Sequence, residues 1–279
     1  MEVHLILEDC ITGMAKMDEN SVDTVVTSPP YNLGKKYSSY VDKLSDEEYF
    51  DWSKKWTSQV KRLLKQDGSF FLNLGATPHN PLFPHKIAIL LCEEFHLQNT
   101  FHWIKSISVN KNDGDILSLG HFKPINSKRY ITDCHEFIFH FTKSGNVNLN
   151  RLSIGVPYAD KSNINRWKHT DGKDLRCRGN NWYIPYPTIQ NKWLDRPHPA
   201  TFPTKLAENC LKIHGFSPEL VILDPFLGIG HSLLAAKKCG AKHFYGFEID
   251  EAYLSVAHKM FKNKQFKQQT FEGEAFIGI

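Results

Sequence analysis

The chain has 279 residues, of which 41% are hydrophobic and 23% charged, and its formal net charge is +4. These proportions are ordinary for a globular protein, and the length suffices for one large α/β domain with a sizeable core. No apolar run approaches the ~20 residues that a membrane-spanning helix needs, and the N-terminus does not resemble a signal peptide. We therefore predict a cytoplasmic protein that does not contact a membrane.

Apolar periodicity predicts strands and helices that alternate along most of the chain. The predicted strands cover residues 3–7, 22–27, 68–74, 100–109, 136–141, 220–223 and 243–249. The predicted helices cover residues 11–17, 45–64, 87–95, 204–214, 232–239 and 250–262. Such alternation is typical of an α/β fold built on a parallel sheet.

The helix predicted at 45–64 has the clearest signals. Ser45 and Glu48 have the spacing of a capping box at its N-terminus. Its apolar residues recur at helical spacing, so they share one face that we expect to pack on the sheet. These residues are Tyr49, Trp52, Trp56, Val60 and Leu63.

Residues 144–196 differ from the rest of the chain. They are rich in Asn, Arg, Lys and turn residues, carry Trp167, Trp182 and Trp193, and have no sustained periodicity. We predict an inserted lobe there. The wider segment 105–196 holds 15 lysines and arginines against 8 aspartates and glutamates, which fits a surface that faces phosphates.

The six cysteines lie far apart and form no C-x-x-C pair, so the sequence indicates neither a zinc site nor a disulfide framework. No cysteine follows a proline. The Pro-Cys nucleophile expected of cytosine-C5 methyltransferases is therefore missing, which counts against that chemistry.

A glycine-rich turn spans residues 224–230, which read Asp-Pro-Phe-Leu-Gly-Ile-Gly, between a predicted strand and a predicted helix. Glycine lets the backbone pass close beneath a ligand because it has no Cβ. Glu248 ends the next predicted strand, where an acid can accept both hydroxyls of a ribose. The loop lacks the Gly-Lys-Ser/Thr of a phosphate-binding P-loop. The pattern predicts a nucleotide-type cofactor.

The tetrapeptide Ser28-Pro29-Pro30-Tyr31 follows the β-branched strand predicted at 22–27. The Ser28 hydroxyl and the Pro29 carbonyl can accept the hydrogens of an amino group, and neither proline has an N–H that would repel it. Tyr31 offers an aromatic face for a base removed from its helix and for a nearby cation. Such an element is suited to bind a planar amino group.

The tetrapeptide and the glycine loop, in this order, resemble the permuted, β-type DNA amino-methyltransferases that use S-adenosylmethionine. The resemblance implies a Rossmann-like fold with a mostly parallel twisted sheet, helices on both faces and an inserted target-recognition lobe. It implies a catalytic part at 1–143, a target-recognition region at 144–196 and a cofactor-binding part at 197–279. It also implies base flipping and catalytic roles for Ser28, Pro29, Pro30 and Tyr31.

The resemblance further assigns the cofactor contacts, and it requires no metal. Asp224 would face the methionine end of the cofactor, Asp9 the adenine amino group, and the segment 198–206 the methionine moiety. One departure is His231, because the family often carries small hydroxyl residues just after the second glycine. The cofactor-binding set implied in this way is Asp9, Phe202, Pro203, Asp224, Pro225, Phe226, Gly228, Gly230 and Glu248.

Serine at position 28 favours cytosine N4 as the target, since Asp-Pro-Pro-Tyr is usual for adenine N6 and Ser-Pro-Pro-Tyr for cytosine N4. An adenine-N6 enzyme and an inactive DNA-binding subunit stay open as alternatives. Glutamine methyltransferases of the release-factor type place their Asn-Pro-Pro-Tyr after the cofactor loop, so the order here argues against them. The implied partners are duplex DNA, a second copy of the chain and a cognate restriction endonuclease. Candidate DNA contacts are Lys111, Lys128, Arg129, Arg151, Arg166, Arg176 and Arg178.

Overall fold

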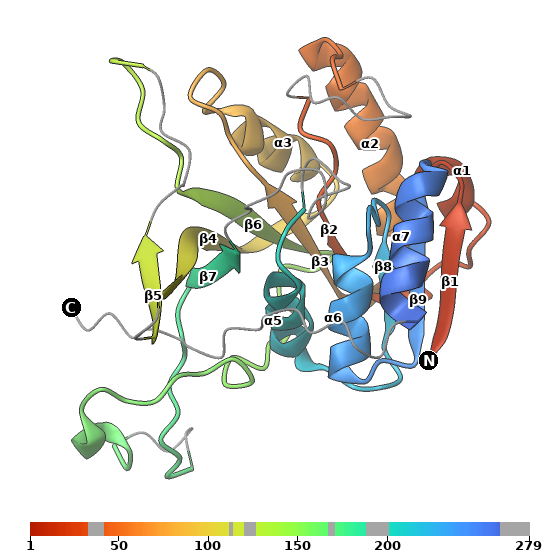
Figure 1. The fold of residues 1–279 in the computed structure, drawn as a ribbon. Helices are drawn as coiled ribbons and strands as arrows, with labels where there is room; N and C mark the ends of the chain where they lie inside the picture. The colour runs from red at the N-terminus through yellow and green to blue at the C-terminus, as the bar shows by residue number, and fades with distance from the viewer. Residues whose placement is uncertain (33–41, 112–113, 120–126, 167–170, 188–200, 263–279) are drawn as a thin grey trace.

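The computed structural model describes residues 1–32, 42–111, 114–119, 127–166, 171–187 and 201–262 (Figure 1). For residues 106–111, 114–119 and 186–187 it describes the backbone alone. Trp167, Trp193 and residues 198–200 of the predicted cofactor segment lie outside the described residues.

The described strands form one nine-stranded sheet. Five neighbouring strands run parallel in the order β1, β9, β8, β2 and β3. Their bounds are Glu2–Leu7, His243–Glu248, Val221–Asp224, Val22–Thr27 and Leu64–Leu74. β6 (His135–Thr142) continues the sheet antiparallel to β3 and to β4 (His96–Lys111). β4 also pairs with β5 (Gly114–Leu119) and, in parallel, with β7 (Asn181–Pro187). The mostly parallel sheet is confirmed.

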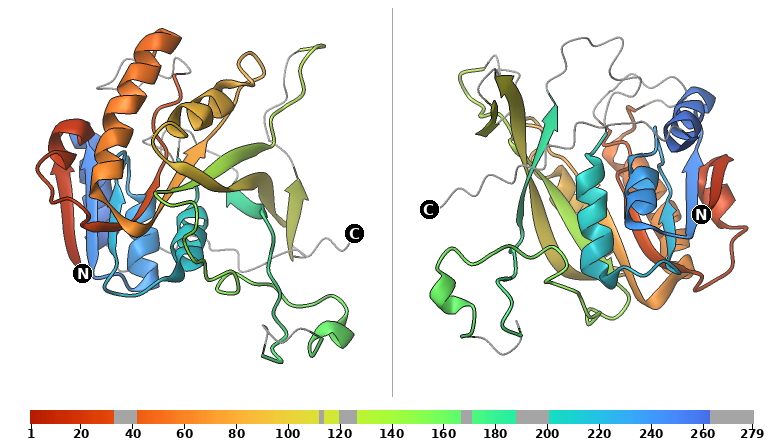
Figure 2. Two further views of the ribbon diagram at one scale, coloured as in Figure 1. Left: turned by 180° about the vertical axis from the view of Figure 1, so that it is seen from behind. Right: turned by 60° about the horizontal axis from the view of Figure 1, so that its bottom comes forward.

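Helices cover both faces of the sheet, as predicted (Figures 1 and 2). One face packs against α1 (Cys10–Met14), α2 (Asp46–Leu63) and α3 (Phe83–Leu91). The other packs against α5 (Thr204–Gly215), α6 (His231–Cys239) and α7 (Glu251–Lys262). None of the helices in the described part of the chain is long and apolar enough to cross a membrane.

The predicted helix at 45–64 matches α2 closely. Ser45 accepts a hydrogen bond from the Glu48 amide at 3.2 Å, and the Glu48 carboxylate accepts one from the Ser45 amide at 2.9 Å. This capping box supplies partners for amides that the first turn cannot satisfy. Helix α3 begins at Phe83, a turn before the predicted start at 87, with Pro84 in its first turn where proline is tolerated.

Two strands, β5 and β7, were not predicted. β7 lies within the segment 144–196, so residues 181–187 belong to the main sheet. Trp182 is fully buried and stacks on Phe101 with a centroid separation of 4.6 Å. Residues 181–184 alternate exposed and buried side chains, but Pro185 and Pro187 hide that pattern in the sequence. Residues 148–180 contain, where described, only a one-turn 3₁₀ helix, η1 (Lys161–Asn163), and an isolated bridge between Val156 and Arg176.

The burial of Trp182 leads to a prediction about the stability of the fold. Trp182→Ala removes a fully buried ring that packs on Phe101, so we expect the free energy of unfolding to fall by about 3–5 kcal/mol. Tyr183→Ala is the matched control, because the neighbouring side chain is 45% exposed and should cost far less. Urea denaturation of both variants measures the difference. Equal losses would mean that β7 is not part of the core.

Candidate active site

The tetrapeptide and the glycine loop meet at one edge of the sheet, the edge formed by the carboxyl ends of its parallel strands. The carboxyl ends of the adjacent parallel strands β2 and β8 lead into them, and the side chains that end these strands touch. The Thr27 hydroxyl donates to the Asp224 carboxylate at 2.6 Å, across 197 residues of sequence. Ligands of open α/β sheets bind at the carboxyl ends of the strands. Both sequence motifs therefore belong to one site.

Asp224 holds the glycine loop to the sheet. Its side chain is buried and accepts hydrogen bonds from Thr27, from the Ser232 hydroxyl at the start of α6 and from the Phe226 amide at 3.0 Å. Burial raises the pKa of Asp224 to about 6, against the lowering effect of these donors. The contacts described for this carboxylate thus brace the loop from within the protein.

The glycine loop has the backbone conformation that requires its glycines. Gly228 has φ 54° and Gly230 has φ 90°, both in the left-handed region that other residues avoid. A Cβ on Gly230 would also lie 3.1 Å from the Ala257 Cβ of α7. The Gly228 amide donates to the Glu248 carboxylate at 2.8 Å. The loop is therefore a tight cradle joined to the end of β9.

Glu248 is fixed where the sequence predicts a ribose-binding acid. Besides the Gly228 amide, it accepts the amides of Ile249 and Asp250, each at 2.9 Å. Burial raises the pKa of Glu248, while these three amides lower it. Since a carboxylate has about four lone-pair directions and three amides occupy three of them, about one direction, on Oε2, is left to accept from a hydroxyl group. The position and the preset orientation fit a nucleoside ligand.

Three other predicted cofactor contacts border the same edge. Asp9 follows β1, and β1 pairs with β9 so that Leu7 lies opposite Glu248. The Asp9 carboxylate caps α1 by accepting hydrogen bonds from the amides of Ile11 and Thr12. Phe202 is buried, and its carbonyl accepts a hydrogen bond of 2.5 Å from His231 Nδ1. Pro203 is the N-cap of α5.

His231 therefore has a structural explanation. As the first residue of α6, it ties the glycine loop to the segment that contains Phe202. Because the partner is a carbonyl, the histidine nitrogen must carry the proton. Phe226 packs on the other side of the loop, with its ring 5.4 Å from Trp52 and 5.1 Å from Trp56 of α2.

The backbone of the tetrapeptide is anchored on both sides. The Tyr49 hydroxyl of α2 donates to the Pro30 carbonyl at 2.5 Å. Asn32, with φ 56°, follows the tetrapeptide and exchanges two hydrogen bonds with the Leu44 backbone, at 2.7 and 2.8 Å. Ser28 and Tyr31 are half-buried, and their hydroxyl oxygens lie 2.7 Å apart.

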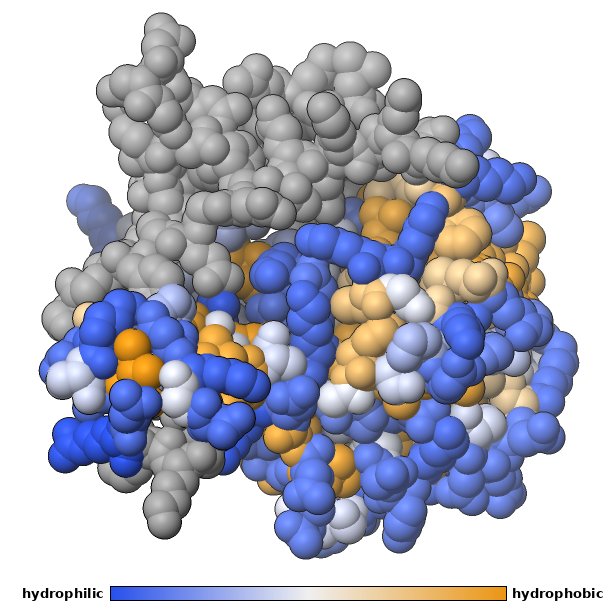
Figure 3. All heavy atoms as spheres, turned by 90° about the horizontal axis from the view of Figure 1, so that it is seen from below, coloured by the Kyte–Doolittle hydropathy of each residue, from blue (hydrophilic) through white to orange (hydrophobic). Residues whose placement is uncertain are grey.

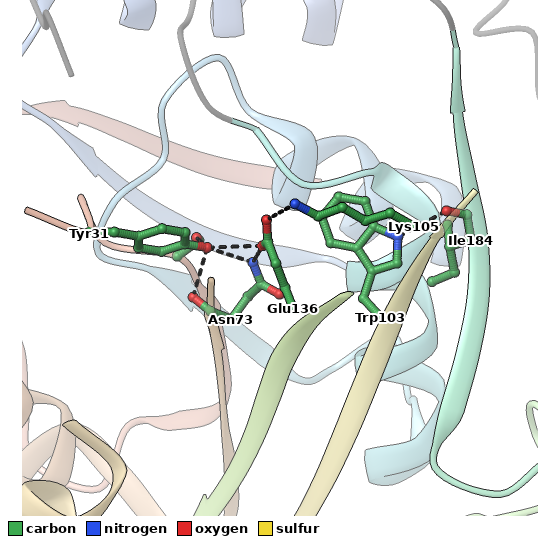
Figure 4. A network of polar contacts seen from close by, with 7 residues as sticks. Tyr31, Asn73, Trp103, Lys105, Glu136 and Ile184 are labelled. Carbon is green, nitrogen blue, oxygen red and sulfur yellow. Dashed lines mark hydrogen bonds and ion pairs between the residues drawn. The ribbon is translucent and has the colours of Figure 1, made fainter. Parts of the chain in front are cut away.

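Three residues that the sequence analysis did not assign complete this site (Figure 4). Asn73 of β3 and Glu136 of β6 contact the Tyr31 hydroxyl, and Lys105 of β4 pairs with Glu136 at 2.7 Å. The available signal was a polar residue inside or at the start of an otherwise apolar strand, which applies to Asn73 and Glu136. Lys105 lies 5.5 Å from the Trp103 ring centroid, and Trp103 in turn donates to the Ile184 carbonyl of β7 at 2.9 Å.

The candidate DNA contacts fall into two groups. Lys128 and Arg129 are exposed just before β6. Arg129 donates to the Tyr130 hydroxyl at 2.6 Å, and the Tyr130 ring meets His79, which lies in the loop after β3, at a centroid distance of 4.8 Å. This group therefore lies near the carboxyl end of β3, on the side of the tetrapeptide. The side chain of Lys111 is outside the described residues.

The second group lies at the opposite edge of the sheet (Figure 1). The Asn150 amide donates to the Ile213 carbonyl at 2.8 Å, which ties the segment to the C-terminal end of α5. Figure 3 shows the molecule from this side, where hydrophilic side chains cover most of the surface that is not grey. Arg178 donates to the Ile154 carbonyl at 2.8 Å, so it supports the segment itself. The structure does not bring this second group together with Ser28; it consists of Arg151, Arg166, Arg176 and Arg178.

The described residues include no group of three or more His, Cys, Asp or Glu side chains that could hold a metal ion. The glycine loop is joined to the carboxyl ends of β8 and β9 through Asp224 and Glu248. The polar cluster around Tyr31 lies beside it at the same edge.

Comparison with known proteins agrees with this geometry. Residues 22–259 match the family model for the N6/N4 methyltransferases, described as DNA methylase. The type II methyltransferase M.ScaI of Streptomyces caespitosus is 33% identical over 266 residues, which cover 92% of this chain and 80% of that protein.

Two solved structures share the fold. PvuII DNA methyltransferase, described as cytosine-N4-specific, has a TM-score of 0.69 at 19% identity and covers 96% of this chain and 89% of its own. A DNA modification methylase of Thermus thermophilus, solved with S-adenosyl-L-methionine, has a TM-score of 0.59 at 24% identity and covers 93% of each chain. Because the family model matches residues 22–259, which are most of the sequence, this chain belongs to the DNA methylase family and is a DNA methyltransferase of the N6/N4 type.

Proposed function

We propose that the protein transfers a methyl group from S-adenosylmethionine to N4 of cytosine in duplex DNA. The observation that carries the proposal is the hydrogen bond between Thr27 and Asp224, which puts Ser28 and the glycine loop at one edge of the sheet. The choice of cytosine rests on Ser28, which replaces the aspartate usual in adenine-N6 enzymes. The type II names of the relatives support modification of a site that a cognate restriction endonuclease recognises.

The proposed cofactor residues form a coherent cradle. Gly228 and Gly230 present no side chain that could obstruct a ligand. Three amides hold Glu248 in an orientation that suits a ribose, and Phe202 borders the loop through His231. Asp224 and Pro225 set the entry to the loop, and Asp9 would meet the far end of a nucleoside. S-adenosylmethionine supplies a methyl group that its positive sulfur makes electrophilic.

The tetrapeptide prepares the target nitrogen. An exocyclic amine is a poor nucleophile because its lone pair is delocalised into the ring. Ser28 Oγ and the Pro29 carbonyl can accept its hydrogens and stabilise the positive charge that grows on nitrogen. The anchored Pro30 carbonyl and Asn32 hold these acceptors in place before the base arrives. A stacked base cannot reach a half-buried Ser28, so the target cytosine must flip out of the duplex.

DNA would approach across the edge that carries the tetrapeptide. We propose Lys128 and Arg129 as phosphate contacts, since both are exposed on that side. The second group could contact DNA only if the duplex also reached the opposite edge of the sheet; this group consists of Arg151, Arg166, Arg176 and Arg178. A homodimer remains a prediction that follows from the family, and a cytoplasmic location remains a prediction that follows from the sequence.

The first prediction concerns the product. Purified protein incubated with S-adenosylmethionine and mixed-sequence duplex DNA should yield N4-methylcytosine after digestion to nucleosides and mass spectrometry. N6-methyladenine would keep the fold and the mechanism but overturn the inference drawn from Ser28. If no methylated nucleoside were detected, the result would favour an RNA substrate or an inactive subunit.

The second prediction concerns Ser28. Ser28→Ala should lower turnover by about 100-fold or more, because it removes an acceptor for the amine, while the Kd for S-adenosylmethionine should stay unchanged. Ser21→Ala is the matched control: Ser21 lies at the other end of β2 and donates to the Asp18 carbonyl. A fully active Ser28→Ala enzyme would refute the assigned role.

The third prediction concerns the cofactor loop. Gly228→Val should weaken S-adenosylmethionine binding at least ~10-fold, or about 1.4 kcal/mol, measured by calorimetry. Gly240→Val is the control, since Gly240 also has positive φ, at 87°, but ends α6 with open space around it. Both variants carry similar backbone strain, so only a cradle at Gly228 predicts different affinities. Equal affinities would place the cofactor elsewhere.

A further inference from the structure

The Tyr31 hydroxyl connects Ser28 to a carboxylate that lies deeper in the sheet (Figure 4). Its oxygen is 2.7 Å from Ser28 Oγ and 3.1 Å from Glu136 Oε2. Asn73 Nδ2 donates to both the Tyr31 oxygen, at 2.8 Å, and Glu136 Oε2, at 2.7 Å. A continuous path of hydrogen-bonding atoms therefore runs from Ser28 through Tyr31 to Glu136.

The donors and acceptors give this path a direction. The Tyr31 oxygen already accepts a hydrogen bond from Asn73, and its single proton has the Glu136 carboxylate within reach. A charged acceptor makes a stronger hydrogen bond than the neutral Asn73 carbonyl, which lies farther away at 3.3 Å. When the Tyr31 O–H donates its hydrogen bond to Glu136, the Tyr31 oxygen can accept a hydrogen bond from the Ser28 hydroxyl. The lone pairs of Ser28 are then left for the hydrogens of an amine.

Lys105 sets the charge at the far end of the path. Its ammonium contacts Glu136 Oε1 at 2.7 Å, so the two carboxylate oxygens have different partners. The two side chains are only 16% and 13% exposed, which makes this pair largely desolvated. The titratable groups that contact Glu136 within the described residues are thus Lys105 and Tyr31. Lys105 balances the carboxylate in the resting enzyme and fixes Oε2 toward Tyr31.

We propose that Glu136 receives, through Tyr31 and Ser28, the proton that the target amine loses during methyl transfer. The nitrogen lone pair forms the new N–C bond while the electrons of the C–S bond stay on sulfur, so the amine then carries one proton too many. That proton passes to Ser28 Oγ, the Ser28 proton to the Tyr31 oxygen, and the Tyr31 proton to Glu136 Oε2. Charge balances, because the cation on nitrogen and the anion on Glu136 disappear together.

Glu136 is accordingly a positioning residue that acts through Tyr31 and Ser28 and does not touch the base. Positive charge develops on nitrogen as the N–C bond forms, so a carboxylate linked through two hydroxyls stabilises the transition state. The inference rests on the proposed amine methylation, and it holds for a cytosine or an adenine target. It gives Tyr31 a second task besides stacking, and it assigns a function to Glu136 and Lys105.

A double-mutant cycle tests the relay. Tyr31→Phe keeps the ring and cuts the path in the middle, whereas Glu136→Gln keeps the shape and removes the final acceptor. We expect each to lower the single-turnover methylation rate by about 10–100-fold, within the range of proton-transfer catalysis. Because both cut one path, the double variant should be no slower than the slower single variant. Losses that multiply would overturn the relay, and so would an unchanged rate in Glu136→Gln.

Binding measurements separate a relay from a structural role. The Kd for S-adenosylmethionine, by calorimetry, and the fluorescence of 2-aminopurine at the target position should match the wild type in both single variants. If either variant lost cofactor binding or base flipping, the polar cluster would serve structure and the proposal would fail. Glu94→Gln is the matched control, since it breaks an exposed pair with Lys61 and should leave the rate unchanged.

The unpaired ammonium of Lys105 is the foreseeable hazard of Glu136→Gln, because a desolvated charge without its partner destabilises the fold. If that variant does not fold, Lys105→Met with Glu136→Gln removes both charges and takes its place in the cycle, with the same expected losses. A wild-type enzyme that methylates no DNA would refute the proposed function itself. Failure of the relay would instead appear as an active wild type whose Glu136 variant is equally fast.

Discussion

The buried carboxylate of Asp224 is the constraint on which the site depends. It lies where β8 ends, and its three donors come from the end of β2, from the glycine loop and from the start of α6. A buried carboxylate is costly, and the rise of its pKa from 3.8 to about 6 corresponds to roughly 3 kcal/mol at neutral pH. Stability from this group falls as pH rises through that interval, since the folded state then holds the proton more tightly. The fold tolerates the cost because one side chain aligns three elements.

Ser28 is held from two directions as a result. On one side, Thr27 fixes the end of β2 to Asp224 and hence to the cofactor loop. On the other, Tyr31 joins the tetrapeptide to Asn73, Glu136 and Lys105 on β3, β6 and β4. Catalytic groups must be held within a fraction of an ångström to be effective. The polar contacts on both sides of the tetrapeptide meet that requirement.

Local patterns in the sequence predicted local structure well. The strand at 22–27 and the capping box at Ser45 were confirmed because β-branched runs and caps depend on neighbouring residues. β7 was missed because its burial depends on β4, about 80 residues away, and its prolines obscure the alternation. Glu136 and Lys105 became part of the site only through strand pairing. A charge count over 105–196 could not show that Arg151 lies at the opposite edge from Ser28.

The order of the strands explains why a permuted sequence still forms one site. β8 and β9, near the end of the chain, insert between β1 and β2 from its beginning. β1 therefore pairs directly with no other strand from the N-terminal part of the chain. The cradle beside Ser28 does not exist until the C-terminal strands have paired with β1 and β2. Contacts between distant segments must pay their loop-closure entropy before they stabilise the fold. The Thr27–Asp224 hydrogen bond is a sensitive marker of that event, because it forms only when the first and last parts of the chain have come together.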